Sequence, residues 1–157
     1  MTTWTEIVSS SLTWEQAHAT LDKAVEGLPK ELRGKRPPNF VHSVWELVEH
    51  IRLTQKDLLD FMADPSYHEP KWPDGYWPPA EQVPTDAQWT KALEGIRADA
   101  QALAKFTVDN VAKLTEKIPR GTGQTYLRTV LVAVDHTSYH VGQIVAVRRL
   151  LGAWTAS

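Results

Sequence analysis

Two histidines spaced four residues apart are the clearest candidates for chemistry in this sequence. His136 and His140 lie within a stretch of helical spacing, so their side chains fall on one face of that helix and can converge on one metal ion. A zinc protease of the His-Glu-x-x-His type needs glutamate directly after the first histidine, but residue 137 is threonine, which excludes that chemistry. Histidine pairs also occur on helix surfaces and in hydrogen-bonded cores, so a third ligand is needed.

His50 is the candidate for that third ligand. It lies in the middle of a separate predicted helix and can project inward toward His136 and His140. Three neutral imidazoles leave a coordination position of a divalent ion open to water or substrate, which is typical of a reactive site. The chain has no cysteine, so a soft metal would have to be bound by histidine. We therefore predict one divalent ion held by the three histidines.

Two polar side chains are candidate catalytic residues beside this ion. Glu46 precedes His50 by one turn, and it can serve as a fourth ligand, an acceptor for an imidazole N–H or a general base. The alternative for Glu46 is a solvated carboxylate on the helix surface. Gln143 follows His140 by three residues and can orient a neighbouring group as a hydrogen-bond donor. Asp57, almost two turns beyond His50, is a weaker candidate of the same kind.

The remaining histidines are weaker candidates for metal binding. His42 lies eight residues before His50, about 12 Å along a helix, which is too far to share the ion without help from a loop. His18 lies on the first predicted helix, where a surface or core-edge role is expected. His68 lies among prolines and is not expected to be a ligand.

Helical spacing of apolar residues predicts four helices that position these groups. Capping patterns mark three of the starts, at Thr13 with Gln16, Thr85 with Gln88, and Thr125, while Gly152 marks the last end. The predicted helices cover residues 14–28, 41–63, 85–108 and 125–151.

A proline-rich segment, residues 64–84, separates the second predicted helix from the third. Its six prolines cannot belong to a regular helix, and its length exceeds most connections, which indicates either a crossover or a lid. The aromatic residues Trp72, Tyr76 and Trp77 can cover the metal pocket or pack against the side of the bundle, and both interpretations stay open.

The whole pattern predicts an all-α four-helix bundle with a long proline-rich crossover between helices 2 and 3, formed as a single domain over residues 1–157. The 157 residues, 42% of them hydrophobic, suffice for a core without disulfides. The net charge of −2 gives no basic field for nucleic acid, so no nucleic-acid partner is expected. No stretch approaches the roughly 18 apolar residues of a membrane span, and we expect a cytoplasmic protein without a membrane partner.

Three stretches carry a family resemblance: residues 44–59 around His50, residues 72–78 in the proline-rich segment and residues 135–144 around the histidine pair. They resemble the DinB-like family of bacterial metal-binding bundles over nearly the whole chain. The resemblance implies metal ligands at His50, His136 and His140, an up-down-down-up helix order and, often, a homodimer. Zinc, nickel, manganese or iron is implied as the metal, without a choice among them.

The resemblance also implies a class of reaction, because characterised activities of the family include transfer or isomerisation with low-molecular-weight bacterial thiols. A thiol cofactor would suit a chain that has no cysteine of its own. We therefore expect a metal-dependent S-transferase or isomerase acting on a small-molecule substrate. A metal-dependent hydrolase is one alternative, and a non-catalytic bundle that binds metal or a small ligand in a stress response is another.

Overall fold

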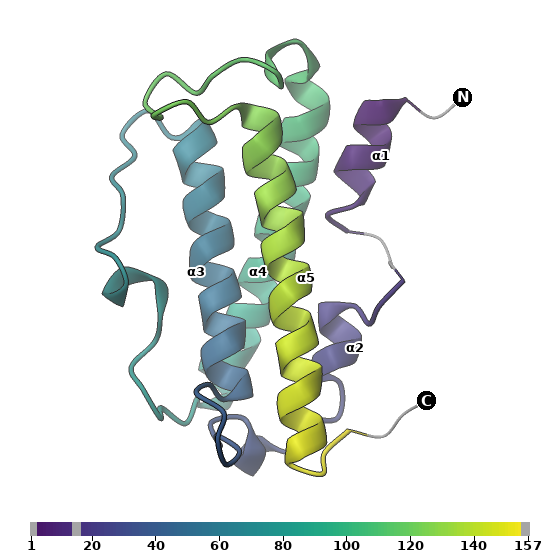
Figure 1. The fold of residues 1–157 in the computed structure, drawn as a ribbon, viewed down its shortest axis with the longest axis vertical. Coiled ribbons are helices and arrows are strands. Elements are labelled where there is room, and N and C mark those ends of the chain that lie inside the picture. The colour runs from purple at the N-terminus through teal and green to yellow at the C-terminus, as the bar shows by residue number, and fades with distance from the viewer. Residues whose placement is uncertain (1–2, 14–16, 155–157) are drawn as a thin grey trace.

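The computed structural model describes residues 3–13 and 17–154, and within them the chain forms five α-helices and no β-strand. They are α1 (Trp4–Ser10), α2 (Leu21–Val25), α3 (Val44–Ala63), α4 (Asp86–Asp109) and α5 (Tyr126–Leu150). Figure 1 shows the three long helices side by side, with α1 and α2 one above the other on the side away from α3. The predicted all-α bundle is confirmed. In this part of the chain, every helix is too short or too polar to span a membrane.

Each long helix begins where a hydroxyl side chain satisfies its first backbone donors. The Thr85 hydroxyl accepts from the Gln88 N–H and the Gln88 amide oxygen accepts from the Thr85 N–H, so the predicted capping box is present. Thr125 caps α5, also as predicted. Ser43 caps α3 with Glu46, which is why that helix begins at Val44 and not at residue 41.

The prediction of one continuous helix over residues 14–28 is wrong. Residues 17–20 are not helical, and α2 begins only at Leu21, because the Thr20 hydroxyl accepts from the Lys23 N–H and caps the helix there. A threonine that bonds the local backbone in this way competes with a continuous helix. Trp14 and Gln16, the latter half of the predicted capping box, lie outside the described residues.

The N-terminal helix α1 has no counterpart in the sequence prediction. It is capped by Thr3, whose hydroxyl accepts from the Glu6 N–H while the Glu6 carboxylate accepts from the Thr3 N–H. The helix packs against α4, whereas α2 packs against α5. Two short helices therefore line the side of the bundle where one long helix was predicted.

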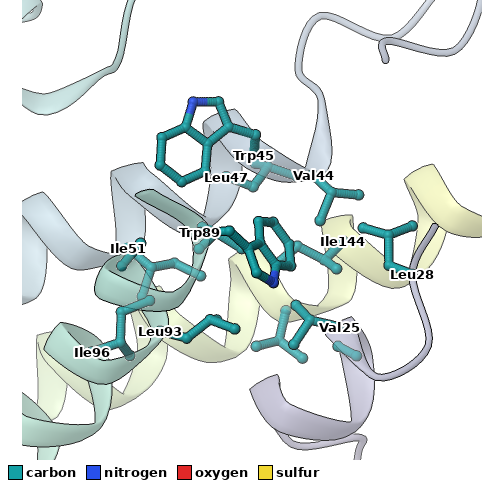
Figure 2. Packing of buried hydrophobic residues seen from close by; sticks show 14 of the residues in the cluster. Val25, Leu28, Val44, Trp45, Leu47, Ile51, Trp89, Leu93, Ile96 and Ile144 are labelled. Atoms are coloured by element: carbon teal, nitrogen blue, oxygen red, sulfur yellow. The ribbon is translucent and has the colours of Figure 1, made fainter. Parts of the chain in front are cut away.

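The main core lies where α2, α3, α4 and α5 meet, and Figure 2 shows its side chains interdigitating. Its buried side chains include Val25, Leu28, Val44, Leu47, Ile51, Trp89, Leu93, Ile96 and Ile144. A second cluster, built on Met62, Leu103, Ile118, Val130 and Ala133, fills the other end of the bundle. Because α3 packs against both α4 and α5, these clusters fix α3 and α5 beside each other, and these two helices carry the three histidines.

A buried arginine ties the end of α5 to its surroundings. The guanidinium of Arg148 donates to the Ala24 carbonyl at 2.7 Å from one nitrogen and to the Ala153 carbonyl from two others at 2.7 and 3.0 Å. The same group lies 5.1 Å above the Trp154 ring. Arg148 therefore joins α2, the last turn of α5 and the residues that follow it.

The proline-rich segment contains no α-helix, only a short 3-10 helix, η2 (Asp74–Tyr76), which contacts α3. Figure 1 shows the segment running along the outer side of α3. Tyr76 is buried there, whereas Trp72 is 71% exposed. This contact places η2 and the residue after it next to the middle of α3.

Candidate metal centre

The three predicted histidines lie together between α3 and α5. His50 projects from the middle of α3, and His136 and His140 project from successive turns of α5. The Nε2 atom of His136 lies 3.1 Å from Nε2 of His50 and 3.1 Å from Nε2 of His140. Nitrogen ligands of a tetrahedral zinc ion, each about 2.0–2.1 Å from the metal, are separated by about 3.3 Å. The spacing therefore suits one shared ion.

The outer nitrogen of His50 fixes the protonation of its ring. Nδ1 lies 2.6 Å from the backbone carbonyl oxygen of Tyr76. A carbonyl can only accept a hydrogen bond, so Nδ1 carries the proton and donates it. In a neutral imidazole the other nitrogen, Nε2, then presents a lone pair, and in His50 that lone pair faces the other two rings.

His136 is held in the same tautomer by Thr54. The Thr54 hydroxyl donates its proton to the carbonyl of His50 at 2.7 Å, which leaves the hydroxyl oxygen free to accept. His136 Nδ1 lies 3.3 Å from that oxygen and donates to it. Nε2 of His136 therefore also presents a lone pair toward the centre of the cluster.

His140 is oriented by Gln143 one turn further along α5. Its Nδ1 donates to the amide oxygen of Gln143 at 2.7 Å, while the amide nitrogen of Gln143 donates to the hydroxyl of Tyr139 at 3.2 Å. Gln143 thus contacts a candidate ligand directly. The predicted orienting role of Gln143 therefore has a partner, His140. The amide was expected to donate a hydrogen bond, but its oxygen accepts one from the histidine.

The cluster as a whole fits a divalent cation. Three Nε2 lone pairs face one another with neighbouring nitrogens 3.1 Å apart, and each Nδ1 is engaged by an oxygen. Lone pairs at that distance repel unless a positive charge lies between them. Imidazoles oriented by outer hydrogen bonds are typical of metal ligands. The grouping of the three histidines is confirmed, and the binding of an ion stays a prediction.

Burial keeps the three rings neutral at physiological pH. Removal from water, together with smaller effects of neighbouring histidines, lowers the pKa of His50 to about 4 and the pKa of His136 to about 4, and the hydrogen bond with the Tyr76 carbonyl opposes the shift of His50. Burial also lowers the pKa of His140, against a smaller opposing effect of its hydrogen bond with Gln143. Protons therefore do not compete with a metal ion for these nitrogens near pH 7.

The lowered pKa values predict a pH-dependent stability of the metal-free protein. His50 and His136 titrate near pH 4 when folded and near pH 6.5 when unfolded, so the unfolded chain binds about two more protons at pH 5. The stability that neutral rings contribute is fully present above pH 6.5 and is lost as the pH falls toward 4. Urea unfolding between pH 7 and pH 4, with chelator, measures this loss. A double variant, His50→Gln with His136→Gln, should lose most of that slope, and an unchanged slope would contradict the assignment.

Trp77 forms a wall of the cluster. Its ring stacks on the His50 ring at a centroid distance of 3.8 Å and an interplanar angle of 2°, and it meets the His140 ring edge-on at 6.3 Å. The His42 ring stacks on the same indole at 4.1 Å. Of the aromatic residues considered for a lid, Trp77 and Tyr76 contact the cluster, whereas Trp72 contacts Tyr76 and is mostly exposed.

The other histidines do not join the cluster of ligand nitrogens in the described residues. His42 lies in the loop before α3, and its ring stacks on Trp77 beside the cluster. His18 and His68 are exposed, and each Nδ1 bonds a nearby backbone carbonyl. The contact of His42 with Trp77 had no signal in the sequence, because both residues lie in irregular segments without a period.

Glu46 is turned toward the start of α3. One of its carboxylate oxygens accepts from Arg36 Nε at 2.9 Å and from the Ser43 N–H at 2.7 Å, and the other accepts from the second Arg36 nitrogen. Burial raises the pKa of Glu46, but the hydrogen bonds from Arg36 and Ser43 outweigh it and lower that pKa overall. With 2% of its surface exposed, Glu46 is not a solvated carboxylate, so that alternative is wrong. Its contacts favour capping and ion pairing, and a catalytic role remains untested.

Replacing Glu46 with glutamine separates those roles. We expect Glu46→Gln to lower the free energy of unfolding by about 1–3 kcal/mol, because Arg36 loses the nearer of its two acidic partners, Glu46 and Glu81. The affinity for a divalent ion should stay within about twofold, since the hydrogen bonds that orient the histidines do not involve Glu46. Urea unfolding and a metal titration measure the two effects. A large loss of metal affinity with unchanged stability would instead support Glu46 as a ligand.

A cavity of about 300 Å³ lies on a different face of α5 from the histidines. Its lining includes Gln55 of α3, Ile96 and Ala100 of α4, and Thr137 and Val141 of α5. None of the three histidines belongs to the lining that the described residues provide. The histidine cluster is therefore separate from this cavity.

Fold and site together define a helical bundle with a three-histidine cluster suited to one metal ion. The sequence matches the DinB superfamily over residues 13–144, which is most of the chain, and the protein belongs to that superfamily. This match confirms the resemblance seen in the sequence. No curated protein matches the chain.

Proposed function

We propose that the protein is a metal-dependent enzyme in which His50, His136 and His140 hold one divalent ion. The observation that carries the proposal is the convergence of three Nε2 lone pairs whose rings are oriented through Nδ1. When bound, such an ion supplies a Lewis acid that polarises an oxygen or sulfur atom of a substrate. Zinc, nickel, manganese and iron(II) all accept imidazole ligands, and the three rings do not choose among them.

A catalytic role is favoured over a purely structural one by the number of ligands. Among the described residues, the group of metal-binding side chains contains only the three histidines, with no fourth histidine, aspartate or glutamate. Structural zinc sites are almost always closed by four protein ligands, whereas catalytic sites keep a position for substrate. His136 is also only half-buried, which supports access from solvent.

The surrounding residues orient the ligands and shape the approach to them. Tyr76, Thr54 and Gln143 hold the three rings through Nδ1, so each acts through a histidine and not on a substrate. Trp77 excludes water from one side of His50 with a flat apolar face. Tyr139 is largely exposed and lies edge-on to His140 at 5.0 Å, at the outer side of the cluster. A small-molecule substrate would approach between these aromatic rings.

The reaction that we propose is S-transfer or isomerisation with a low-molecular-weight thiol as cofactor. Membership of the DinB superfamily and the absence of cysteine support it, because an external thiol supplies the nucleophile that the chain lacks.

We also propose the up-down-down-up helix order, with the proline-rich segment as the crossover from α3 to α4. The same proposal includes a single domain over residues 1–157 and a homodimer in the bacterial cytoplasm.

A thiol-transferase screen tests the reaction. The metal-loaded protein is incubated with a panel of bacterial thiols and an electrophilic acceptor, and loss of free thiol is followed. We expect turnover with at least one thiol that stops on addition of chelator and is absent from His136→Ala. Chelator-insensitive turnover, or none with any thiol, would contradict S-transfer. Chelator-sensitive cleavage of activated esters would then favour the hydrolase.

A further inference from the structure

A carboxylate on α3, seven residues beyond His50, is bound by two tyrosines of the proline-rich segment. Asp57 accepts a hydrogen bond from the Tyr67 hydroxyl at 2.7 Å on one oxygen and from the Tyr76 hydroxyl at 3.2 Å on the other. Asp57 is half-buried, so these bonds are partly shielded from water. They attach two points of an otherwise irregular segment to the same turn of α3.

The charge of Asp57 makes its burial unfavourable in free energy, which is unusual for a purely structural contact. Burial raises its pKa, and the charged groups that act on it, Glu69 and Asp60, are both acidic and raise it further. The two tyrosine hydroxyls oppose that shift. Among the described residues, no ion pair joins Asp57 to a cation, and an unpaired charge is costly to remove from water. Asp57 therefore serves here as the acceptor for two hydroxyl groups.

Tyr76 connects this carboxylate to the metal centre. Its hydroxyl donates to Asp57, while its backbone carbonyl accepts the Nδ1 proton of His50 at 2.6 Å. The next residue, Trp77, stacks on the same His50 ring. Both groups that orient His50 from outside thus belong to a piece of chain that Asp57 holds in place.

We propose that Asp57 is a positioning residue of the metal centre. It holds Tyr76 and Trp77 against α3 so that His50 keeps its Nδ1 proton and directs its Nε2 lone pair toward His136 and His140. The proposal rests on the proposed metal function. The coupling also acts in the other direction. If docking of Tyr76 and Trp77 against α3 strengthens metal binding by a given free energy, metal binding stabilises that docking by the same free energy.

The expected effect on metal binding follows from the contacts that lead from Asp57 through Tyr76 to His50. Loss of a group that orients a metal ligand typically lowers metal affinity by about 10- to 100-fold. Asp57→Leu removes both acceptors, and Tyr76→Phe removes one hydroxyl while leaving the backbone carbonyl in place. Asp57→Asn keeps an amide oxygen for one of the two tyrosines, so its effect should be intermediate.

Cobalt(II) is the probe for the first test. Affinity is measured by competition titration of the full chain, and visible absorption reports the geometry around the ion. We expect Asp57→Leu and Tyr76→Phe to bind about 10- to 100-fold more weakly with an altered spectrum, and Asp57→Asn to recover part of the loss. The matched control is Asp60→Asn, which removes a charge from the same helix at an ion pair with Lys56. It should stay within about twofold of wild type.

The second test needs no metal. Nitrogen-15 spectra of the metal-free protein report which ring nitrogen of His50 carries the proton and how fast it exchanges. In wild type we expect a slowly exchanging proton on Nδ1, and in Asp57→Leu and Tyr76→Phe a mixture of tautomers with faster exchange. If wild type binds no cobalt, the metal function fails, but this spectrum still decides the positioning role.

Three results would overturn the inference. The first is an affinity within twofold of wild type in both Asp57→Leu and Tyr76→Phe. The second is an equal loss in Asp60→Asn, which would indicate a general effect of charge. The third is an unchanged His50 spectrum in the variants. If circular dichroism shows that Asp57→Leu does not fold, Tyr76→Phe alone carries both tests, since it removes a single oxygen atom.

Discussion

Replacing His136 with alanine is expected to lower the affinity for a divalent ion by at least about 100-fold while leaving the helices folded. His136 lies at the centre of the cluster, with its Nε2 3.1 Å from both other Nε2 atoms. Losing a group that merely orients a ligand costs about 10- to 100-fold, so losing the central ligand should cost more. The helices should persist because both core clusters consist of apolar residues that do not depend on the histidines.

The same variant should respond differently to metal in unfolding experiments. An ion at 100 times its dissociation constant stabilises the wild type by about 2.7 kcal/mol, and the variant should gain far less at the same concentration. Circular dichroism and a metal titration measure these effects. His68→Ala, at an exposed histidine outside the cluster, is the control. Wild-type affinity in His136→Ala would contradict the site.

The largest expected loss of stability comes from Leu47 in the main core. Its side chain is 0% exposed and packs where α3 meets α4 and α5, so Leu47→Ala leaves a cavity that the long helices cannot easily close. Such a change typically costs about 2–5 kcal/mol of unfolding free energy. That is a large part of the roughly 5–15 kcal/mol available to a small domain.

Urea unfolding of the metal-free protein measures this loss, with Leu150→Ala as the matched control. Leu150 is the same residue type at the end of α5 but is 59% exposed, so its replacement should change stability by less than about 0.5 kcal/mol. If Leu47→Ala costs less than 1 kcal/mol, or no more than the control, the packing of α3 described here is wrong.

The long helices and the histidine cluster were predictable from the sequence because their determinants are local. The four-residue spacing puts His136 and His140 on one face whatever the rest of the chain does. Capping residues such as Thr85 and Thr125 bond backbone groups within one turn, so the helix starts that they predict do not depend on distant parts of the chain. His50 needed more than spacing, since only helical facing and the family resemblance joined it to a distant helix.

The first predicted helix failed because apolar spacing does not show whether a helix is continuous. Ala24, Val25 and Leu28 are buried as their spacing indicated, yet only a five-residue helix, α2, carries the first two. Thr20 interrupts the pattern with a local hydrogen bond that apolar periodicity does not detect.

The contacts of Glu46 could be predicted only in part. Its position one turn before His50 suggested a role at the metal, but Ser43 followed three residues later by Glu46 is a capping-box pattern. That pattern was present in the sequence and identifies the contact that the structure shows. An arginine ten residues earlier, Arg36, completes the environment of the carboxylate, and such a non-local partner carries no sequence signal.

Apart from Gln143, the groups that orient the ligands were the least predictable part of the site. The acceptor for His50 is a backbone carbonyl, and every residue carries one, so residue type gives no indication of it. Asp57 and its two tyrosines meet only because an irregular segment folds back onto α3. Contacts of this kind depend on the path of a loop, which neither spacing nor composition fixes.

The most direct test of the central claim is the metal content of the protein after loading. Purified wild type is incubated separately with zinc, nickel, manganese and iron(II), passed through a desalting column and analysed for bound metal. We expect one ion per chain with at least one of these metals, and none retained by His136→Ala under the same conditions. A wild-type protein that retains none of the four metals would contradict a metal centre at His50, His136 and His140.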